Sequence, residues 1–258
     1  MTLNVSSRIV EQEQSVLSGS LCERVAVVTG ASSGIGRAIA IALAREGAHI
    51  NVVGRNSTAL AETVGMVGDH CSANELPADL TSDADVNRIA DALSRLSGID
   101  ILVHSAGIIC QRRMEDAAIE DFDAQYSVNV RAPYLLTKRL LPMLVAAGGQ
   151  VVFINSTAGL TTSRADAGQY AATKHALRAV ADSLRQELNP KGIRVLSVYL
   201  GRTAGPMQEK LFREEGKTYH PEALLQPEEV ASVIVHALTV PRTAEVTDIS
   251  IRPMYKSY

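Results

Sequence analysis

Residues 25–46 read VAVVTGASSGIGRAIAIALARE. The first five are small or β-branched, as in a buried strand, and the last ten have helical periodicity. Between them lies a turn with glycines at positions 30, 34 and 36. Glycine lets the backbone turn tightly and approach a phosphate closely, and the free N–H groups at a helix start favour an anion. The stretch therefore predicts a strand, a phosphate-binding turn and a helix, in that order.

Two other interpretations of this turn need weighing. A Walker loop, which binds ATP or GTP, is disfavoured because Arg37 follows the last glycine where such a loop requires Lys and then Ser or Thr. A plain glycine-rich turn without a ligand stays open on the glycines alone. The neighbouring strand and helix favour a dinucleotide pyrophosphate.

The alternation of strand and helix continues along the chain. Short apolar runs predict strands at residues 25–29, 50–53, 101–103, 151–154 and 195–198. Helical periodicity covers residues 35–46, 58–66, 84–96, 122–144, 167–188 and 228–238. Strands that are apolar throughout are buried on both faces, as in a parallel sheet covered by helices. We therefore expect an α/β fold, a single doubly wound Rossmann domain with a parallel sheet of about seven strands and a ligand crevice beyond their carboxyl ends.

Two regions differ from this alternation. Residues 1–20 are polar, and we expect a loosely held extension there, followed by one domain over residues 21–258. Residues 201–226 contain three glycines and two prolines and show no clear period. A long irregular segment in a compact domain is more often a lid or binding loop than padding, so residues 201–226 are expected to form a lid on the substrate side.

Composition excludes several classes of protein. A net charge of −3, only three Phe and no Trp argue against a nucleic-acid partner. No apolar run approaches the roughly 20 residues of a membrane span, and residues 1–20 lack the apolar stretch of a signal peptide. Cys22, Cys71 and Cys110 have no paired spacing, so neither disulfides nor a metal site are expected. The cytoplasm is the expected location.

The spaced glycines after the first strand resemble the glycine motif of the short-chain dehydrogenase/reductase family. The resemblance extends from about Arg24 to Pro253. It implies that a nicotinamide dinucleotide is held by residues of the turn, namely Gly30, Ser32, Ser33, Gly34, Ile35 and Gly36.

The end of the second strand bears on the choice between NAD and NADP. In the family an acid here binds the ribose 2′-hydroxyl of NAD, and a basic residue accepts the 2′-phosphate of NADP. Gly54 stands in place of the acid, and Arg55 offers a guanidinium suited to phosphate. NADP (NADPH) is therefore expected, with Arg55 as a solvated charge left open. Asp79 and Leu80 resemble the pair that flanks the adenine ring, although Asp79 also fits a helix cap.

The fourth strand runs into His104-Ser105-Ala106-Gly107, where the family usually has Asn-Asn-Ala-Gly. Ala106 and Gly107 match, and the resemblance places them beside the cofactor ribose. The hydrogen bonds of the missing asparagines are expected to come from His104 or Ser105. We interpret His104 as a structural hydrogen-bonding residue and not as a catalyst.

Tyr170 and Lys174 lie four residues apart in a helical segment and share one face. A free tyrosine ionises near pH 10, and a neighbouring ammonium favours the phenolate. Ser156, after the strand at 151–154, and Asn129 complete the family's catalytic set. The resemblance implies that Ser156 polarises a carbonyl, Tyr170 transfers the proton, Lys174 also holds the nicotinamide ribose, and Asn129 supports a water-linked relay. A structural kink would also explain Asn129.

Two departures from the family pattern lie on the substrate side. The loop after Ser156 is one residue longer than usual, and Leu200 replaces a proline. Thr203 is expected to hydrogen-bond the nicotinamide carboxamide, although Gly205 stands where a hydroxyl residue is often found.

The residues together predict an oxidoreductase that transfers a hydride between NADP(H) and the carbonyl or secondary alcohol of a small organic substrate. A non-catalytic NADP-binding sensor or scaffold stays open, as does an epimerase or dehydratase on the same fold. A hydrolase is disfavoured because Ser156 lacks the Gly-x-Ser-x-Gly elbow. Arg164 and Arg202 fit an anion at the pocket mouth. Many relatives form tetramers through the helices that match 122–144 and 167–188, so a homo-oligomer, tetramer or dimer, is expected, with core packing as the alternative.

Overall fold

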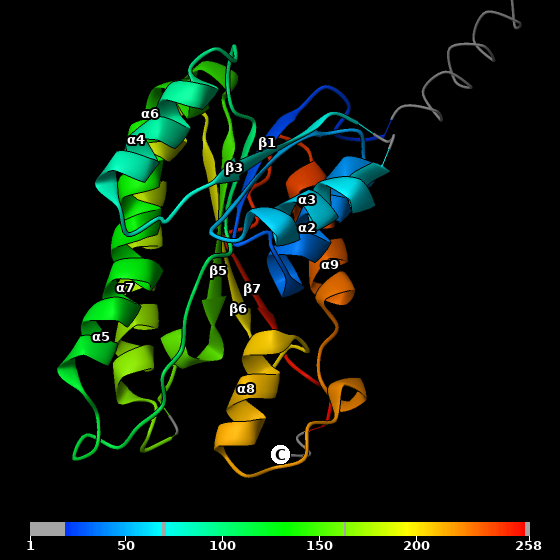
Figure 1. Cartoon of the computed structure of the whole chain (residues 1–258). Helices are drawn as coiled ribbons and strands as arrows, with labels where there is room; N and C mark the ends of the chain where they lie inside the picture. The colour runs from blue at the N-terminus through cyan, green and yellow to red at the C-terminus, as the bar shows by residue number, and fades with distance from the viewer. Residues whose placement is uncertain (1–18, 69–70, 163, 256–258) are drawn as a thin grey trace, which may run out of the picture.

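The computed structural model describes residues 19–68, 71–162 and 164–255 (Figure 1). Of the expected N-terminal extension, residues 1–18 lie outside the described residues. The strands are β1 (Val25–Thr29), β2 (His49–Gly54), β3 (Ala73–Pro77), β4 (Ile101–His104), β5 (Gln150–Ser156), β6 (Arg194–Leu200) and β7 (Asp248–Ile251). The helices are α2 (Gly34–Arg45), α3 (Ser57–Val67), α4 (Asp83–Leu93), α5 (Ile119–Tyr126), α6 (Ala132–Ala147), α7 (Gly168–Leu188), α8 (Pro206–Glu214) and α9 (Pro227–Thr239).

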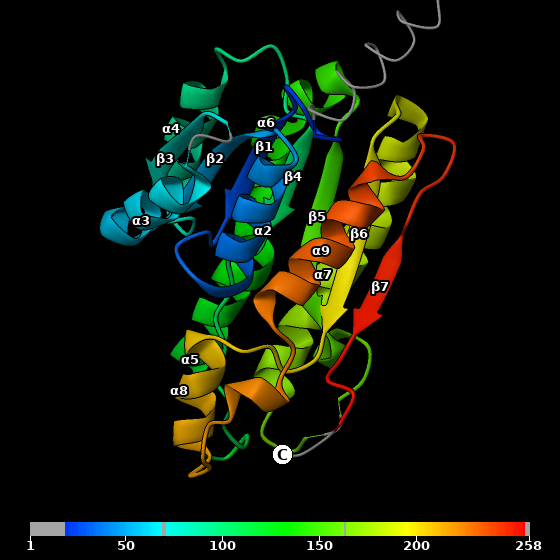
Figure 2. The same cartoon turned by 90° about the vertical axis from the view of Figure 1, so that its right-hand side faces the viewer.

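The strands form one seven-stranded sheet in the order β3-β2-β1-β4-β5-β6-β7. Every neighbouring pair is parallel. Helices α2, α3 and α9 cover one face, and α4, α6 and α7 cover the other (Figures 1 and 2). This arrangement confirms the expected doubly wound Rossmann fold. The strand order reverses between β1 and β4, which places a crevice at the carboxyl ends of these two strands.

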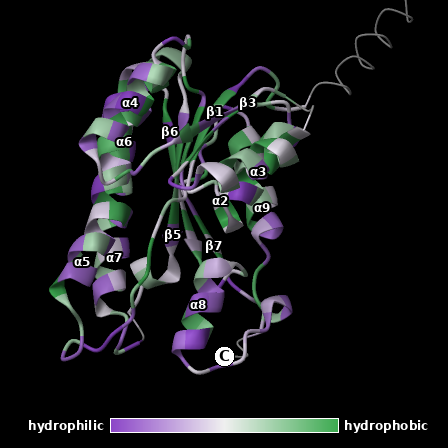
Figure 3. Ribbon diagram, in the orientation of Figure 1, coloured by the Kyte–Doolittle hydropathy of each residue, from purple (hydrophilic) through white to green (hydrophobic). Residues whose placement is uncertain are grey.

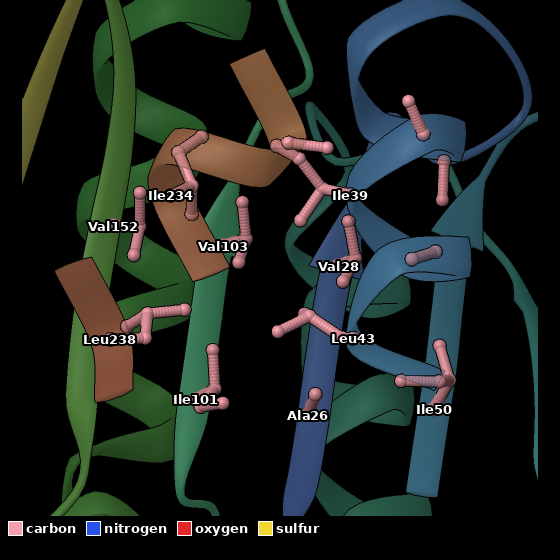
Figure 4. Packing of buried hydrophobic residues seen from close by; sticks show 14 of the residues in the cluster. Ala26, Val28, Ile39, Leu43, Ile50, Ile101, Val103, Val152, Ile234 and Leu238 are labelled. Atoms are coloured by element: carbon pink, nitrogen blue, oxygen red, sulfur yellow. The ribbon is translucent and has the colours of Figure 1, made fainter. Parts of the chain in front are cut away.

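The core has two layers because side chains alternate along each strand. Ala26 and Val28 of β1 face α2, where they pack with Ile39 and Leu43 (Figure 4). Val27 faces the opposite layer and belongs to the cluster of α4, α6 and α7. Each fully buried Leu, Ile or Val side chain contributes roughly 1.5–3 kcal/mol relative to an exposed one. The two apolar layers therefore fix the sheet from which the crevice opens. Figure 3 shows this apolar centre and the more hydrophilic outer helices.

The sequence did not indicate the ranges of the two edge strands, β3 and β7, or of the helix α8. β3 and β7 have half-exposed burial patterns and carry the sequences ANELP and DISI, so neither shows an apolar run. The segment predicted as one helix at 122–144 is three pieces, α5, a π-helical turn at Ser127–Arg131, and α6. No helix among the described residues is long and apolar enough to cross a membrane.

The expectation of an irregular segment at 201–226 is wrong. It contains α8, whose Leu211 and Phe212 are buried. Phe212 packs with Ala204 and Leu224, and its ring meets that of Tyr219 edge to face at 5.6 Å. The segment has its own small apolar core, which the glycines and prolines around it concealed in the sequence. In Figures 1 and 2, α8 lies beyond the carboxyl ends of the strands.

Candidate active site

A cavity of about 770 Å³ opens at the carboxyl edge of the sheet. This volume lies within the usual range for ligand sites. Of the residues that the sequence analysis singled out as site residues, all but Asn129 line the cavity, namely Gly30, Ser32, Ser33, Gly34, Ile35, Gly36, Arg55, Asp79, Leu80, Ala106, Gly107, Ser156, Tyr170, Lys174 and Thr203. The fold thus brings together residues that lie up to 173 positions apart in the chain, from Gly30 to Thr203.

The glycine turn fits a phosphate group. Gly34 has a left-handed φ of +53°, and a Cβ added there would meet nothing within 4 Å. Among the described residues, no side chain caps the start of α2, and its first turn contains no acid. The N–H groups at this helix start therefore stay available to an anion. By contrast, α3 and α4 are capped by Asn56 and Ser82.

Gly36 and Gly30 are required for close packing of the backbone. A Cβ on Gly36 would lie 2.3 Å from the Gly30 carbonyl oxygen, and one on Gly30 would lie 2.7 Å from backbone atoms of Ala106. Thr29 completes this junction, since its hydroxyl donates to the Val103 carbonyl at 3.2 Å and accepts from the N–H groups of the next loop. The turn and the loop after β4 are thereby held as one surface.

Thr29 is a residue that the sequence analysis missed. Its hydroxyl accepts the N–H groups of Ser105 at 3.1 Å and Ala106 at 3.2 Å. The hydrogen bonds of the missing asparagines were expected to come from His104 or Ser105, and the bonds to these two backbone N–H groups come in addition from Thr29. A polar residue at the end of an otherwise apolar strand was the available signal.

His104 has a structural role, as expected. Its Nε2 lies 2.7 Å from the Thr137 hydroxyl, and its ring stacks on Phe153 at 5.0 Å. Burial lowers the pKa of His104 to about 3, so the ring is neutral at physiological pH. The side chain links β4 to α6, on the opposite layer from the glycine turn.

Arg55 is the arginine near the glycine turn that faces the cavity. It is exposed and lines the cavity beside Gly54 and Asp79. Arg37 is occupied elsewhere, since its guanidinium donates to the Ser32 and Ala59 carbonyls. Of these two arginines, Arg55 is therefore the one whose guanidinium can contact a ligand at the end of the cavity beside Gly54 and Asp79.

Asp79 lies in the turn before α4. Its carboxylate accepts the N–H and hydroxyl of Thr81 at 2.9 and 2.8 Å, and these bonds are the main cause that lowers its pKa. The side chain that caps α4 is Ser82, which accepts the Asp85 N–H. Asp79 and Leu80 both line the cavity. The residue therefore orders its own turn and faces the ligand space as well.

Ser156 is held at the carboxyl end of β5 by its neighbours. Its Oγ accepts the Ala158 N–H at 3.1 Å, and its own N–H donates to the Asn155 side chain at 2.8 Å. The Asn155 amide also donates to the Lys174 carbonyl at 3.2 Å. Asn155, which the sequence analysis did not single out, thus ties the strand that carries Ser156 to the helix that carries Lys174.

Tyr170 and Lys174 lie on the first turns of α7. Lys174 is buried, its Nζ donates to the Ile154 carbonyl at 3.0 Å, and it lies 5.7 Å from the centre of the Tyr170 ring. Burial lowers the pKa of Lys174 to about 8. Burial also raises the pKa of Tyr170 to about 12, against the smaller opposite effect of a hydrogen bond with Ser156.

Burial is the dominant influence on the tyrosine pKa. The expected effect of the Lys174 ammonium, which favours the phenolate, stays a prediction, because the loss of hydration sets the direction of the shift. Tyr170 is therefore protonated at neutral pH. Lys174, with a pKa of about 8, is the one of the two groups that titrates close to neutral pH. Ser156 contributes the one hydrogen bond that lowers the tyrosine pKa.

Asn129 lies behind the cavity wall, in the π-helical turn at Ser127–Arg131. Its amide donates to the Ile108 carbonyl at 2.9 Å and to the Thr173 hydroxyl at 3.1 Å, and its Oδ1 accepts the Ile108 N–H at 2.9 Å. Both interpretations of this residue, a hydrogen-bonding duty and a kink, fit what is observed. π-turns of this kind are frequent at functional sites. Asn129 joins the loop after β4 to α7 beside Lys174.

Thr203 and the segment that follows it cover the cavity from the other side. The Thr203 hydroxyl donates to the Gly201 carbonyl at 3.2 Å, and its backbone pairs with Leu225. Gly205 donates its N–H to the Tyr219 hydroxyl at 2.8 Å. Met207 and Leu211 of α8 line the cavity.

Comparison of the whole chain with known sequences identifies relatives. The chain is 34% identical over 234 residues to an uncharacterized oxidoreductase of Staphylococcus epidermidis, a match that covers 90% of this chain and 98% of that protein. It is 31% identical over 238 residues to an uncharacterized oxidoreductase of Staphylococcus aureus, covering 91% and 99%.

Two solved structures of the same fold are complexes with NADPH or a derivative of NADP. An alcohol dehydrogenase from the archaeon Thermococcus sibiricus, complexed with 5-hydroxy-NADP, superposes with a TM-score of 0.81 at 26% identity and covers 92% of this chain and 99% of that one. L-sorbose reductase from Gluconobacter frateurii, complexed with NADPH and L-sorbose, gives 0.82 at 27% identity, with 90% and 96% covered.

The family itself follows from a third comparison. The model of the short chain dehydrogenase family matches residues 24–216, which include the glycine turn and the Ser156, Tyr170 and Lys174 side chains. The relatives, which align over nine-tenths of the sequence, agree with this match, because they are oxidoreductases. The chain belongs to the short-chain dehydrogenase/reductase family of oxidoreductases.

Proposed function

We propose that this oxidoreductase transfers a hydride between NADP(H) and the carbonyl or secondary alcohol of a small organic substrate. The observation that carries the proposal is that Ser156, Tyr170 and Lys174 line the same cavity as the glycine turn of α2. A bound nicotinamide supplies or accepts the hydride at its C4. The protein then has to bind the substrate oxygen and move one proton to or from it.

The Ser156 and Tyr170 hydroxyls are the groups proposed to bind the substrate oxygen. Ser156 Oγ accepts the Ala158 N–H and its hydroxyl forms a hydrogen bond with Tyr170, and we propose that the Ser156 proton is donated to the carbonyl oxygen when a substrate binds. A tyrosine with a pKa of about 12 is protonated, as a proton donor in reduction must be. In reduction the carbonyl carbon gains the hydride, its oxygen gains the Tyr170 proton, and the phenolate regains a proton from water. Oxidation of the alcohol runs the same steps backwards.

Lys174 and Asn129 are proposed to support this proton transfer. An ammonium beside Tyr170 stabilises the phenolate that reduction leaves behind, and we propose that the same ammonium binds the nicotinamide ribose. Asn129 holds the Ile108 backbone and Thr173, so it acts here as a positioning residue for the loop and helix that flank Lys174.

NADP is proposed over NAD for two reasons. Arg55 faces the cavity where Gly54 provides no competing carboxylate, and a guanidinium matches a phosphate. The alcohol dehydrogenase and the sorbose reductase, which share this fold, were solved with forms of NADP. Ala106, Gly107 and Thr203 are proposed to contact the nicotinamide half of the cofactor, while Asp79 and Leu80 flank its adenine.

The rival functions are less well supported. A sensor without turnover has no use for a buried lysine next to a tyrosine, because burying an ammonium is costly. An epimerase or dehydratase would use the same cavity, but the relatives in the sequence comparison carry the name oxidoreductase.

We further propose a cytoplasmic homo-oligomer, a tetramer or a dimer. Tyr126 of α5 and Tyr134 and Val145 of α6 are exposed apolar side chains on one layer of the molecule, and burial against a second copy would remove them from water.

Replacing Tyr170 by Phe should lower kcat for carbonyl reduction by about 10²–10⁴-fold, because the proton donor is lost while the ring is kept. Steady-state kinetics at 340 nm measure the effect, and fluorescence titration checks that NADPH still binds. Tyr255→Phe is the matched control and should retain full activity, because Tyr255 is exposed and does not line the cavity. Near-normal turnover of the Tyr170 variant would contradict the assignment.

NADPH binding should weaken as pH rises through about 8. Lys174 carries its proton below that pH and loses it above, since burial has lowered its pKa. If the ammonium binds the ribose, the NADPH dissociation constant should rise by up to about tenfold between pH 7 and 9. Lys174→Ala should bind weakly at every pH, without this step. An identical pH dependence in both proteins would exclude Lys174 as its source.

Cofactor preference should depend on Arg55. A charge-assisted hydrogen bond is worth roughly 1.5–3 kcal/mol, so Arg55→Ala should cut NADPH affinity by about ten- to a hundredfold and leave NADH affinity unchanged. Gly54→Asp with Arg55→Ala should reverse the preference once the Ser32 hydroxyl rotates, because a Cβ at position 54 lies 2.4 Å from that oxygen. Arg95→Ala is the control, because Arg95 is an exposed arginine just after α4 that does not line the cavity. Equal affinity of the unchanged protein for NADH and NADPH would refute the role.

The segment at 201–226 is proposed to act as a lid. Its apolar core is small, so opening exposes few buried side chains, and ligands beneath it add contacts that only the closed form makes. Hydrogen exchange at residues 210–217 should slow when NADP and a substrate are added, and more than with NADP alone. α4, on the far layer, serves as the internal reference. Complete protection of residues 210–217 from hydrogen exchange in the ligand-free protein would show that the segment is rigid and would contradict the lid.

A further inference from the structure

The far end of the cavity has an uneven distribution of charge. We call the part lined from the loops after β4, β5, β6 and β7 the substrate end. Its charged side chains are Arg164, Arg202 and Arg252, and no Asp or Glu lines it among the described residues. Among the residues that the structure describes, the one acid that lines the whole cavity is Asp79, which lies at the opposite end, where we propose that the adenine binds.

Acids near these arginines lie behind the cavity wall. Glu215, just after α8, accepts from Arg202 and forms an ion pair with Arg164 at 3.0 Å. Asp166 accepts two hydrogen bonds from Arg164, at 3.0 and 2.8 Å. Neither carboxylate is part of the cavity lining given by the described residues. The acids therefore orient Arg164 and Arg202 from behind.

Positive charge exceeds negative charge in this cluster. Glu215 also forms an ion pair with Lys217 at 2.9 Å, so this single carboxylate is paired with three cations, Arg164, Arg202 and Lys217. The neighbouring Glu214 is paired with Lys210 at 3.7 Å. Although burial raises the pKa of Glu215, hydrogen bonds from Arg202 and Lys217 outweigh it and keep that pKa below its usual value. Glu215 is thus ionised at neutral pH, and the cluster still carries a positive excess.

Arg252 is the guanidinium available for direct contact. It follows β7, is exposed, and lines the cavity. A Cβ built on Gly201 would lie 3.1 Å from the Arg252 Cα, which places Arg252 beside the backbone that leads into Arg202. Within residues 19–68, 71–162 and 164–255, Arg252 forms no ion pair. Its charge is therefore not balanced by a carboxylate of the described chain.

We propose that the substrate is an oxo acid, or the corresponding hydroxy acid, whose carboxylate is bound at the substrate end by Arg252 while its carbonyl lies at Ser156 and Tyr170. Arg164 and Arg202 add a favourable field, since charges in a partly closed site are weakly screened. A guanidinium matches the two oxygens of a carboxylate. The proposal rests on the proposed function, because it requires a carbonyl to be reduced at the same cavity.

A panel of matched compounds tests the substrate class. The panel contains 2-, 3-, 4- and 5-oxo acids and the primary amide of each, assayed with NADPH. At least one acid should exceed its own amide by about tenfold or more in kcat/KM, as expected for one charge-assisted contact. Reduction of amides as well as acids across the panel would overturn the proposal.

Two variants of Arg252 test its role. In Arg252→Gln the acid should lose about ten- to a hundredfold in kcat/KM, mainly through KM, while its amide changes little. Arg252→Lys should recover part of the loss. Arg242→Gln is the matched control, because Arg242 is also exposed but precedes β7, at the end of that strand away from the cavity. An equal loss for acid and amide would show a structural role and overturn the assignment.

A binding measurement separates this proposal from the proposed function. Calorimetry with the NADP complex and the saturated carboxylic acid, which has no carbonyl, should show binding that Arg252→Gln weakens by at least about tenfold. If no carbonyl compound is reduced but this acid binds, the proposed reaction fails and the anion site stands. If neutral ketones are reduced and the acid does not bind, the anion site fails and the reaction stands.

Discussion

The reversal of strand order between β1 and β4 is the constraint on which the site depends. Parallel strands need crossover helices, and right-handed crossovers place α2 and α3 on one face and α4 on the other once the chain returns to add β4. The connections after β1 and β4 therefore leave the sheet in opposite directions and cannot fill the space between them. The uncapped start of α2 faces this space, so one topological feature supplies both the cavity and the end of it that we propose binds an anion.

Burial has opposite consequences for the two titratable groups at the centre of this cavity. Loss of hydration raises the pKa of Tyr170 to about 12 and lowers that of Lys174 to about 8, which moves apart two values that nearly coincide in free side chains. A tyrosine that stays protonated suits proton donation, and a lysine near neutrality can exchange its proton. The spacing of Tyr170 and Lys174 revealed the pair in the sequence, but the size of the desolvation effect depends on layers of packing that no local pattern shows.

The sequence predicted the interior of the fold better than its margins. β1, β4, β5 and β6 lie inside the sheet, and their burial on both faces produces apolar runs that are visible without a structure. β3 and β7 lie at the edges, where half-exposed positions accept Asn, Glu, Asp and Ser. α8 was hidden for a related reason, because its only buried residues are Leu211 and Phe212, and Phe212 packs with Ala204 and Leu224, which lie outside the helix on either side of it.

The two halves of the cavity also differ in how far the sequence predicts them. The proposed cofactor half consists of short motifs in which the residues that act together are neighbours in the chain, such as the glycine turn or the Tyr170–Lys174 pair, and such motifs can be recognised in a sequence. The proposed substrate half depends on contacts between distant segments: Arg164 forms an ion pair with Glu215, and Arg252 packs beside Gly201. A carboxylate behind the wall changes what an arginine in front of it can do, and only the three-dimensional arrangement shows on which side each charge lies. Specificity in this chain is accordingly a property of the tertiary fold, whereas the reaction class is already present in its local sequence.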